Sequence, residues 1–136
     1  MKAEISDDCE VLVEVHLATL YFVFADLEVE SVTGHASSYE YGDGLDATVR
    51  IRNTGAGTAG SSDLHYYLGT SSDWDYYPIE QGSIGALGTN GWEDDQIDGT
   101  WGTWNIPSSI PEGTYRIYVE ADSNSDVAEE NEGNNW

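Results

Sequence analysis

The fold is decided by a nine-residue stretch in which apolar and polar side chains alternate: LDATVRIRN, residues 45–53. Successive side chains of an extended chain point to opposite faces, so Leu45, Val49 and Ile51 share one face with Ala47. The stretch therefore predicts a β-strand with one buried face. The sequence NTGAGTAG at residues 53–60 then predicts a turn. It does not fit a phosphate-binding loop, because no lysine and no helical pattern follow it.

Similar patterns recur on both sides of this stretch, with turn-forming residues between them. Strands are predicted at residues 10–17, 27–34, 63–68, 79–84 and 115–121, and residues 92–106 are predicted to form a long, irregular strand pair. An amphipathic helical pattern is absent. The sequence therefore predicts an all-β fold, a two-sheet antiparallel sandwich. Its predicted core consists of Leu45, Val49, Ile51, Leu64, Tyr66, Trp104, Ile106, Tyr115, Ile117 and Val119.

The charge of the chain limits its partners. The chain has 26 acidic residues against four lysines and arginines, a formal net charge of −22 at pH 7. Such a surface repels nucleic acid and anionic membranes, so neither is an expected partner. The charge fits a calcium-rich exterior, or a high-salt environment that screens the self-repulsion.

Cysteine content and hydrophobicity exclude further classes. The single cysteine, Cys9, cannot form an internal disulfide and supports neither a zinc site nor a redox pair. The longest apolar run, residues 17–25, is shorter than the roughly 18–20 residues that a membrane helix needs. Acidic rather than basic residues precede this run, which does not fit a signal peptide. We therefore expect no membrane insertion, and we expect the run to remain in the folded chain.

Oxygen-bearing side chains occupy alternate positions after the last predicted strand, at Asp122, Asn124 and Asp126, and Glu129 and Glu132 follow them. Calcium takes about six to eight oxygen ligands, and a turn with alternate oxygens can surround it. These five residues are the predicted ligands of Ca²⁺. In the alternative interpretation, the Asp and Asn side chains cap a tight turn by accepting backbone N–H groups. The loop is not an EF-hand, because its sixth and twelfth positions are valine and glycine.

Five segments occur in an order that is similar to a known family. They are ADLEV (25–29), VRIRNTGAGTAG (49–60), YYLGTSSD (66–73), IP and IPEGTY (106–107 and 110–115), and VAEENEGNN (127–135). Together they resemble the CARDB/APHP modules, immunoglobulin-like domains of bacterial and archaeal secreted proteins. The resemblance covers residues 25–136. It implies a seven-strand immunoglobulin-like sandwich, extracellular or at the cell surface, that serves as a spacer, adhesion or assembly module rather than as a catalyst.

Two features depart from these modules. The modules normally begin near Asp26 and continue past the Asn-Asn pair into a final strand, whereas here residues 1–24 are extra and the sequence ends at Trp136. We therefore expect two units. Residues 1–24 would form an N-terminal extension with an extra strand, and residues 25–136 would form a sandwich with an open edge.

The strand predicted at residues 10–17 has the length and alternation to fill such an edge. Its apolar face consists of Val11, Val13, Val15 and Leu17. If this strand adds to its own sandwich, the protein is a monomer. If it adds to the next copy, the contact is head-to-tail and repetition builds a fibre, which is the arrangement that we favour. The expected partners are therefore other copies of the chain or neighbouring extracellular domains.

Two other classes of function fit the sequence less well. An enzyme is not expected, because the three histidines, at positions 16, 35 and 65, have no recurrent partner to orient them. A carbohydrate-binding module of a secreted hydrolase is the alternative function, since exposed aromatic rings can stack on sugar rings. Its candidate platform is Trp74, Trp92 and Trp101, and its partner would be a polysaccharide.

Overall fold

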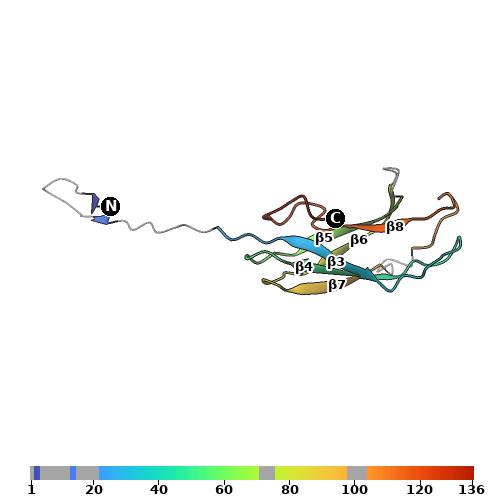
Figure 1. Cartoon of the computed structure of the whole chain (residues 1–136), viewed down its shortest axis with the longest axis horizontal. Coiled ribbons are helices and arrows are strands. Elements are labelled where there is room, and N and C mark those ends of the chain that lie inside the picture. The colour runs from blue at the N-terminus through green and yellow to red at the C-terminus, as the bar shows by residue number, and fades with distance from the viewer. Residues whose placement is uncertain (1, 4–12, 15–21, 71–75, 98–103) are drawn as a thin grey trace.

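The computed structural model describes residues 2–3, 13–14, 22–70, 76–97 and 104–136. In these residues, six strands form two three-stranded antiparallel sheets that lie face to face (Figure 1). A separate two-stranded sheet pairs β1 (Lys2–Ala3) with β2 (Val13–Glu14). The predicted all-β, two-sheet antiparallel sandwich is confirmed, and β2 lies within the strand predicted at residues 10–17.

The first sheet has the order β3-β4-β7, with β4 (Ala47–Asn53) between β3 (Leu27–Thr33) and β7 (Trp92–Ile97). Burial alternates strictly along β4, as its sequence predicts. The pairing of β3 with β4 shifts register between Val29 and Ser31, so β3 contains a bulge. This bulge brings Val32, instead of Ser31, onto the face that packs against the core.

The second sheet has the order β6-β5-β8, with β5 (Ser62–Gly69) between β6 (Tyr76–Ile84) and β8 (Arg116–Glu120). β6 is an edge strand, as predicted, but it begins three residues earlier than the predicted range. Of the strand pair predicted at residues 92–106, the described residues show β7 and a bridge between Gly44 and Asn105, and residues 98–103 lie outside the described structure.

The core lies between the two sheets. Of the ten predicted core residues, Leu45, Val49, Ile51, Leu64, Tyr66 and Val119 are buried. The other four, Trp104, Ile106, Tyr115 and Ile117, pack against the core but stay half-buried. Ile117 belongs to the edge strand β8, and the remaining three lie outside the strands. In these positions the side chains are partly exposed to solvent. The core prediction is therefore confirmed for the six residues at the centre, and it overestimated the burial of the four residues at the edge of the core.

The outer face of the first sheet carries two ion pairs. Arg50 donates to Asp94 through Nε and Nη2, at 2.7 and 2.9 Å. Arg52 donates in the same bidentate manner to Glu30, at 2.6 and 3.2 Å. The Arg50 guanidinium also lies 3.7 Å from the ring centroid of Trp92. Two of the four cationic residues of the chain are therefore paired on this one face.

Residues 22–26, which we call the lead-in segment, are held through their backbone by the turn after β4. Gly57 donates its N–H to Phe24 O at 2.9 Å, and Thr54 donates to Asp26 O at 2.8 Å. A Cβ atom added at Gly55 would lie only 2.4 Å from Phe24 O, so glycine is required for this approach.

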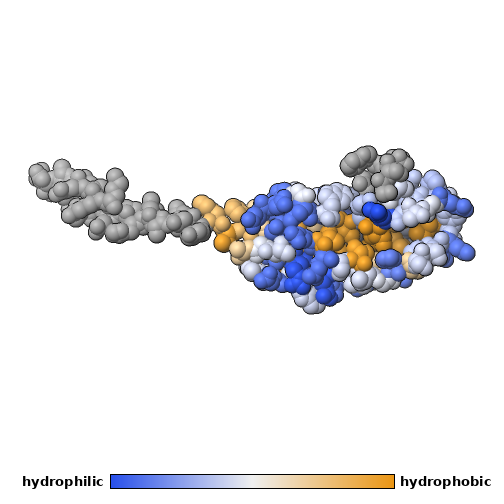
Figure 2. All heavy atoms as spheres, viewed as in Figure 1, coloured by the Kyte–Doolittle hydropathy of each residue, from blue (hydrophilic) through white to orange (hydrophobic). Residues whose placement is uncertain are grey.

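Ala25 of the lead-in segment is buried in the core, but the three apolar residues before it lie at the surface. Phe22, Val23 and Phe24 are 80 %, 61 % and 45 % exposed. Figure 2 shows them as an apolar patch at the N-terminal end of the sandwich. Such a patch is typical of a surface that packs against a neighbouring structure.

Candidate metal centre

The loop after β8 begins with a turn that Asp122 caps. Asp122 has a left-handed φ of 48° and is 3 % exposed. Its carboxylate accepts the N–H of Asp126 through Oδ1 at 2.8 Å and the N–H of Val127 through Oδ2 at 3.0 Å. The capping interpretation of this turn is therefore correct for Asp122. Each of its oxygens still has a second lone pair available.

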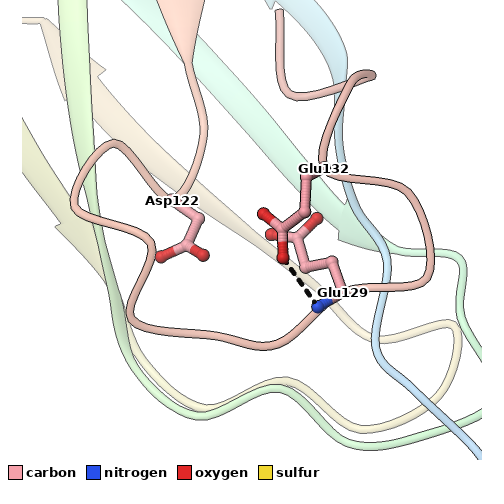
Figure 3. Close-up of side chains that lie close together, drawn as sticks. All are labelled: Asp122, Glu129 and Glu132. Carbon is pink, nitrogen blue, oxygen red and sulfur yellow. Dashed lines mark hydrogen bonds between the residues drawn. The ribbon is translucent and has the colours of Figure 1, made fainter.

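Asp122 also belongs to a cluster of three carboxylates that come from this single loop (Figure 3). Asp122, Glu129 and Glu132 each have an oxygen that lies within 4.8 Å of an oxygen of the other two. Glu132 is fixed by its Oε1, which accepts the Glu129 N–H at 3.1 Å. Oxygens that bind one calcium ion at about 2.3–2.6 Å lie at most about 5 Å apart, so the cluster has the dimensions of a calcium site.

Glu129 has the least satisfied carboxylate of the cluster. Its Oε2 accepts the Leu27 N–H at 3.1 Å, and it also accepts Asn135 Nδ2 at 2.9 Å when the amide is oriented by its hydrogen-bond partners. Its Oε1 is buried and has no hydrogen-bond partner within the described residues. Burial raises the pKa of the Glu129 carboxyl to about 7, and the carboxylates of Asp122, Glu132 and Asp26 also raise it. A half-buried carboxylate with one buried, unpaired oxygen is stabilised by a cation or by a proton.

The structure places the other two predicted ligands elsewhere. Asn124 donates from Nδ2 to Asp63 Oδ2 at 2.6 Å. Asp126 lines a separate polar hollow of about 410 Å³, together with Asp63 and Glu93. The Ser125 N–H bonds Asp122 O at 2.8 Å, so the chain reverses between these residues instead of surrounding a common centre. The structure thus brings together three of the five predicted ligands.

Contacts between this loop and the lead-in segment were not predicted from the sequence. Ala25 and Glu129 form a parallel bridge, and Glu130 donates its N–H to Ala25 O at 2.8 Å. Asn134 donates from Nδ2 to Asp26 Oδ1 and to Glu28 Oε1, both at 3.0 Å. The neighbouring side-chain amides of Asn134 and Asn135 were the sequence feature that could have indicated these contacts. Amide groups are neutral hydrogen-bond donors, and carboxylates, which are abundant in this chain, can accept from them.

The remaining candidate residues are only partly within the described structure. Trp92 begins β7, is 49 % exposed, and has the Arg50 guanidinium over its ring. Trp74 and Trp101 lie outside the described residues, so the carbohydrate platform stays a prediction. Of the predicted assembly strand, Val13 lies in β2, and the other members, Val11, Val15 and Leu17, lie outside the described residues.

Comparison with known proteins identifies the class. Residues 24–136 match the CARDB family, and the chain belongs to this family, as its motifs indicated. One similar structure is the CARDB domain of a Pyrococcus furiosus protein, solved in complex with di-metal ions. It has 23% identity and a TM-score of 0.59, and the match covers 85% of this chain and 90% of that domain.

A second similar structure is a domain of a Methanosarcina acetivorans protein that is predicted to lie at the cell surface. It has 20% identity and a TM-score of 0.58, and the match covers 82% of this chain and 85% of that domain. At these identities the two structures support the fold. A search of curated proteins gave no match. Within the described residues there is no helix with the length and hydrophobicity to span a bilayer.

Proposed function

We propose that this chain is an extracellular structural module for adhesion or surface assembly, in which Asp122, Glu129 and Glu132 hold a calcium ion. Membership of the CARDB family supports the structural role. An extracellular location is supported by the similar domain from a predicted cell-surface protein. The net charge of −22 also supports it, because a calcium-rich exterior compensates such a charge.

The observation that carries the calcium proposal is the unpartnered Glu129 Oε1, which is buried beside two further carboxylates. A divalent cation would satisfy this oxygen and remove the repulsion among the three charges. The di-metal complex of the Pyrococcus furiosus domain supports metal binding by a domain of this fold. Calcium suits the cluster better than magnesium, because calcium accepts irregular sets of carboxylates and waters whereas magnesium demands a near-ideal octahedron.

Thermal unfolding tests this proposal. Binding to the folded state at about ten times Kd stabilises it by about 1.4 kcal/mol, which corresponds to a rise in Tm of roughly 3–6 °C for a domain of this size. The measurement compares calcium, magnesium and excess chelator at equal ionic strength, so that general screening is constant. Glu129→Gln should abolish the calcium-dependent rise. Glu130→Gln is the matched control, because it removes the same charge from an exposed neighbour outside the cluster.

Two results would contradict the calcium site. One is a Tm that is the same in calcium and in chelator. The other is a calcium-dependent rise that Glu129→Gln and Glu130→Gln retain equally, since that result would indicate general screening.

We also propose that copies of the chain join by strand addition at β8. Within the described residues, β8 pairs with β5 alone and forms an edge of its sheet, beside which a further strand could pair. Directly after β8, Ala121 donates its N–H to Asn135 O at 2.7 Å. Figure 2 shows a strip of apolar side chains on the side of the sandwich between β3 and β8. In these two strands, Val29 and Val32 of β3 and Ile117 of β8 are half-buried and pack against the core. The alternating apolar residues of the 10–17 segment are chemically suited to cover this strip.

Light scattering of the full chain across a wide concentration range tests the strand addition. The expected result is a mass that grows with concentration. Deletion of residues 1–18 should leave a monomer, and a synthetic peptide of residues 8–20 should bind that monomer. A full-length chain that stays monomeric at high concentration would contradict addition between copies. A truncated chain that fails to bind the peptide would contradict this segment as the added strand.

A further inference from the structure

The carboxylate cluster contacts the start of β3 as well as its own loop. Glu129 Oε2 accepts the Leu27 N–H at 3.1 Å, and the next residue, Glu130, donates its N–H to Ala25 O at 2.8 Å. In Figure 3, the ribbon of the lead-in segment and β3 passes beside Glu129. The side chain that would bind the cation is therefore also one that holds the chain where it enters the sandwich.

The opposite side of the lead-in segment is held by neutral groups. Asn53 Oδ1 accepts the Asp26 N–H at 3.0 Å. Thr54 and Gly57 donate their N–H groups to Asp26 O and Phe24 O, at 2.8 and 2.9 Å. These three hydrogen bonds come from the end of β4 and the turn after it, and they involve no carboxylate side chain. A cation at the cluster has no direct effect on them.

We infer that the cation bound by Asp122, Glu129 and Glu132 closes the loop after β8 onto residues 25–27, so that it controls how firmly the sandwich holds the lead-in segment. This inference rests on the calcium site proposed above. Without a cation, the charged Glu129 carboxylate is half-buried beside two like charges, with its Oε1 unpaired, and is stabilised by moving into water. That movement would break its bond to the Leu27 N–H and weaken the adjacent bridge. With a cation, the same carboxylate is held in place and the bond persists.

The consequence is a junction with one permanent side and one cation-dependent side. The turn after β4 holds the lead-in segment in either state. The loop after β8 holds it only when the cation is bound. Calcium would thereby set the stiffness of the connection between the sandwich and whatever precedes it in the chain.

Amide hydrogen exchange of the full chain tests this inference, measured residue by residue in calcium and in excess chelator at equal ionic strength. The Leu27 and Glu130 amides report the cation-dependent side, and the Thr54 and Gly57 amides report the permanent side. Calcium should slow exchange at Leu27 and Glu130 by at least about tenfold and at Thr54 and Gly57 by less than about threefold. The calcium effect at Leu27 should be lost in Glu129→Gln and kept in Glu130→Gln.

The outcomes separate this inference from the proposed calcium site. If calcium raises Tm but slows exchange equally on both sides of the lead-in segment, the site is upheld and the local closure is overturned. If calcium raises Tm and Leu27 exchange is unchanged, the closure is likewise overturned. If calcium changes neither Tm nor exchange, the calcium site itself is contradicted.

Discussion

The buried side chain of Asn53 accepts the Asp26 N–H at 3.0 Å and so joins the end of β4 to the lead-in segment. Its Nδ2 donates to three carbonyl oxygens, those of Gly57, Leu87 and Gly88, at 2.8, 3.2 and 3.3 Å. One fully buried amide thus connects three separate stretches of chain.

Asn53→Asp should destabilise the protein strongly. The substitution replaces the Nδ2 donor with an oxygen that faces carbonyl oxygens, at a position with 0% exposure. The buried charge or unsatisfied group should lower the free energy of unfolding by at least about 3 kcal/mol. Urea denaturation measures the change. Thr58→Ala, at an exposed position of the turn after β4, is the control and should stay within about 0.5 kcal/mol of wild type. Equal stabilities of the two variants would show that the Asn53 amide is dispensable.

Gly55→Ala should also be destabilising, by about 1–3 kcal/mol. The new Cβ would meet backbone atoms of Phe24, Ala25 and Asp26 at 2.4–2.5 Å, and backbone cannot move aside as a flexible side chain can. Gly60→Ala is the matched control in the same turn, because a Cβ atom added there would meet no heavy atom within 4 Å apart from its chain neighbours. Calorimetric Tm values for both variants give the comparison. The steric argument fails if Gly55→Ala melts at the wild-type temperature.

The loss of stability on truncating a core residue should increase with the burial of its side chain. Ile51→Ala removes a side chain with 0% exposure and should cost about 2–5 kcal/mol, the range for buried aliphatic residues. Ile117→Ala, on the half-buried margin, should cost clearly less. Denaturant unfolding of the monomer measures both. A cost at Ile117 equal to that at Ile51 would mean that a further element covers β8 in solution.

The stability of the cation-free protein should depend on pH through Glu129. Its pKa in the folded state is about 7, raised from 4.5 mainly by burial. A raised carboxyl pKa contributes stability that is fully present below pH 4.5 and is lost as the pH rises through 7. In excess chelator, Tm should therefore fall between pH 5 and pH 8 by more in wild type than in Glu129→Gln. Glu130→Gln controls for the general effect of charge. An identical pH profile for wild type and Glu129→Gln would exclude a raised Glu129 pKa.

At pH 8 in chelator, Glu129→Gln should melt above wild type, because it removes a half-buried charge that has two acidic neighbours. In calcium the order should reverse, since only wild type gains the binding energy. A crossing of the two Tm values is the expected signature of a site built for a cation. Parallel Tm values in both conditions would argue against it.

Strand positions could be predicted from local alternation, because one face of each strand is buried and the other is exposed. Burial alternates in this way in the strands that contain Val49 and Leu64. The strand that contains Val119 lies within its predicted range, but its burial alternates less strictly. The bulge between Val29 and Ser31 could not be predicted, because it depends on pairing with β4 rather than on the residues of β3. The same limit explains the four marginal core residues, whose burial depends on what lies beyond the edges of the sheets.

The candidate site was predicted in part for a similar reason. Spacing along the loop placed acids in it, but it could not show that the reversal at Ser125 separates Asn124 and Asp126 from the cluster. The contact between Glu129 and Leu27 joins residues 102 positions apart, so no local pattern encodes it. It became visible only when the two sheets brought the loop and the start of β3 together.

The outer face of the first sheet affects how closely copies of this acidic molecule can approach one another. Arg50 and Arg52 neutralise Asp94 and Glu30 there, and both pairs lie within 3.2 Å. The face is consequently almost neutral, while the molecule as a whole carries −22. Copies that approach through this face meet far weaker repulsion than copies that approach through the carboxylate-rich loops. At high protein concentration, contacts between copies should therefore form preferentially through this face, and added salt should weaken that preference by screening the repulsion elsewhere.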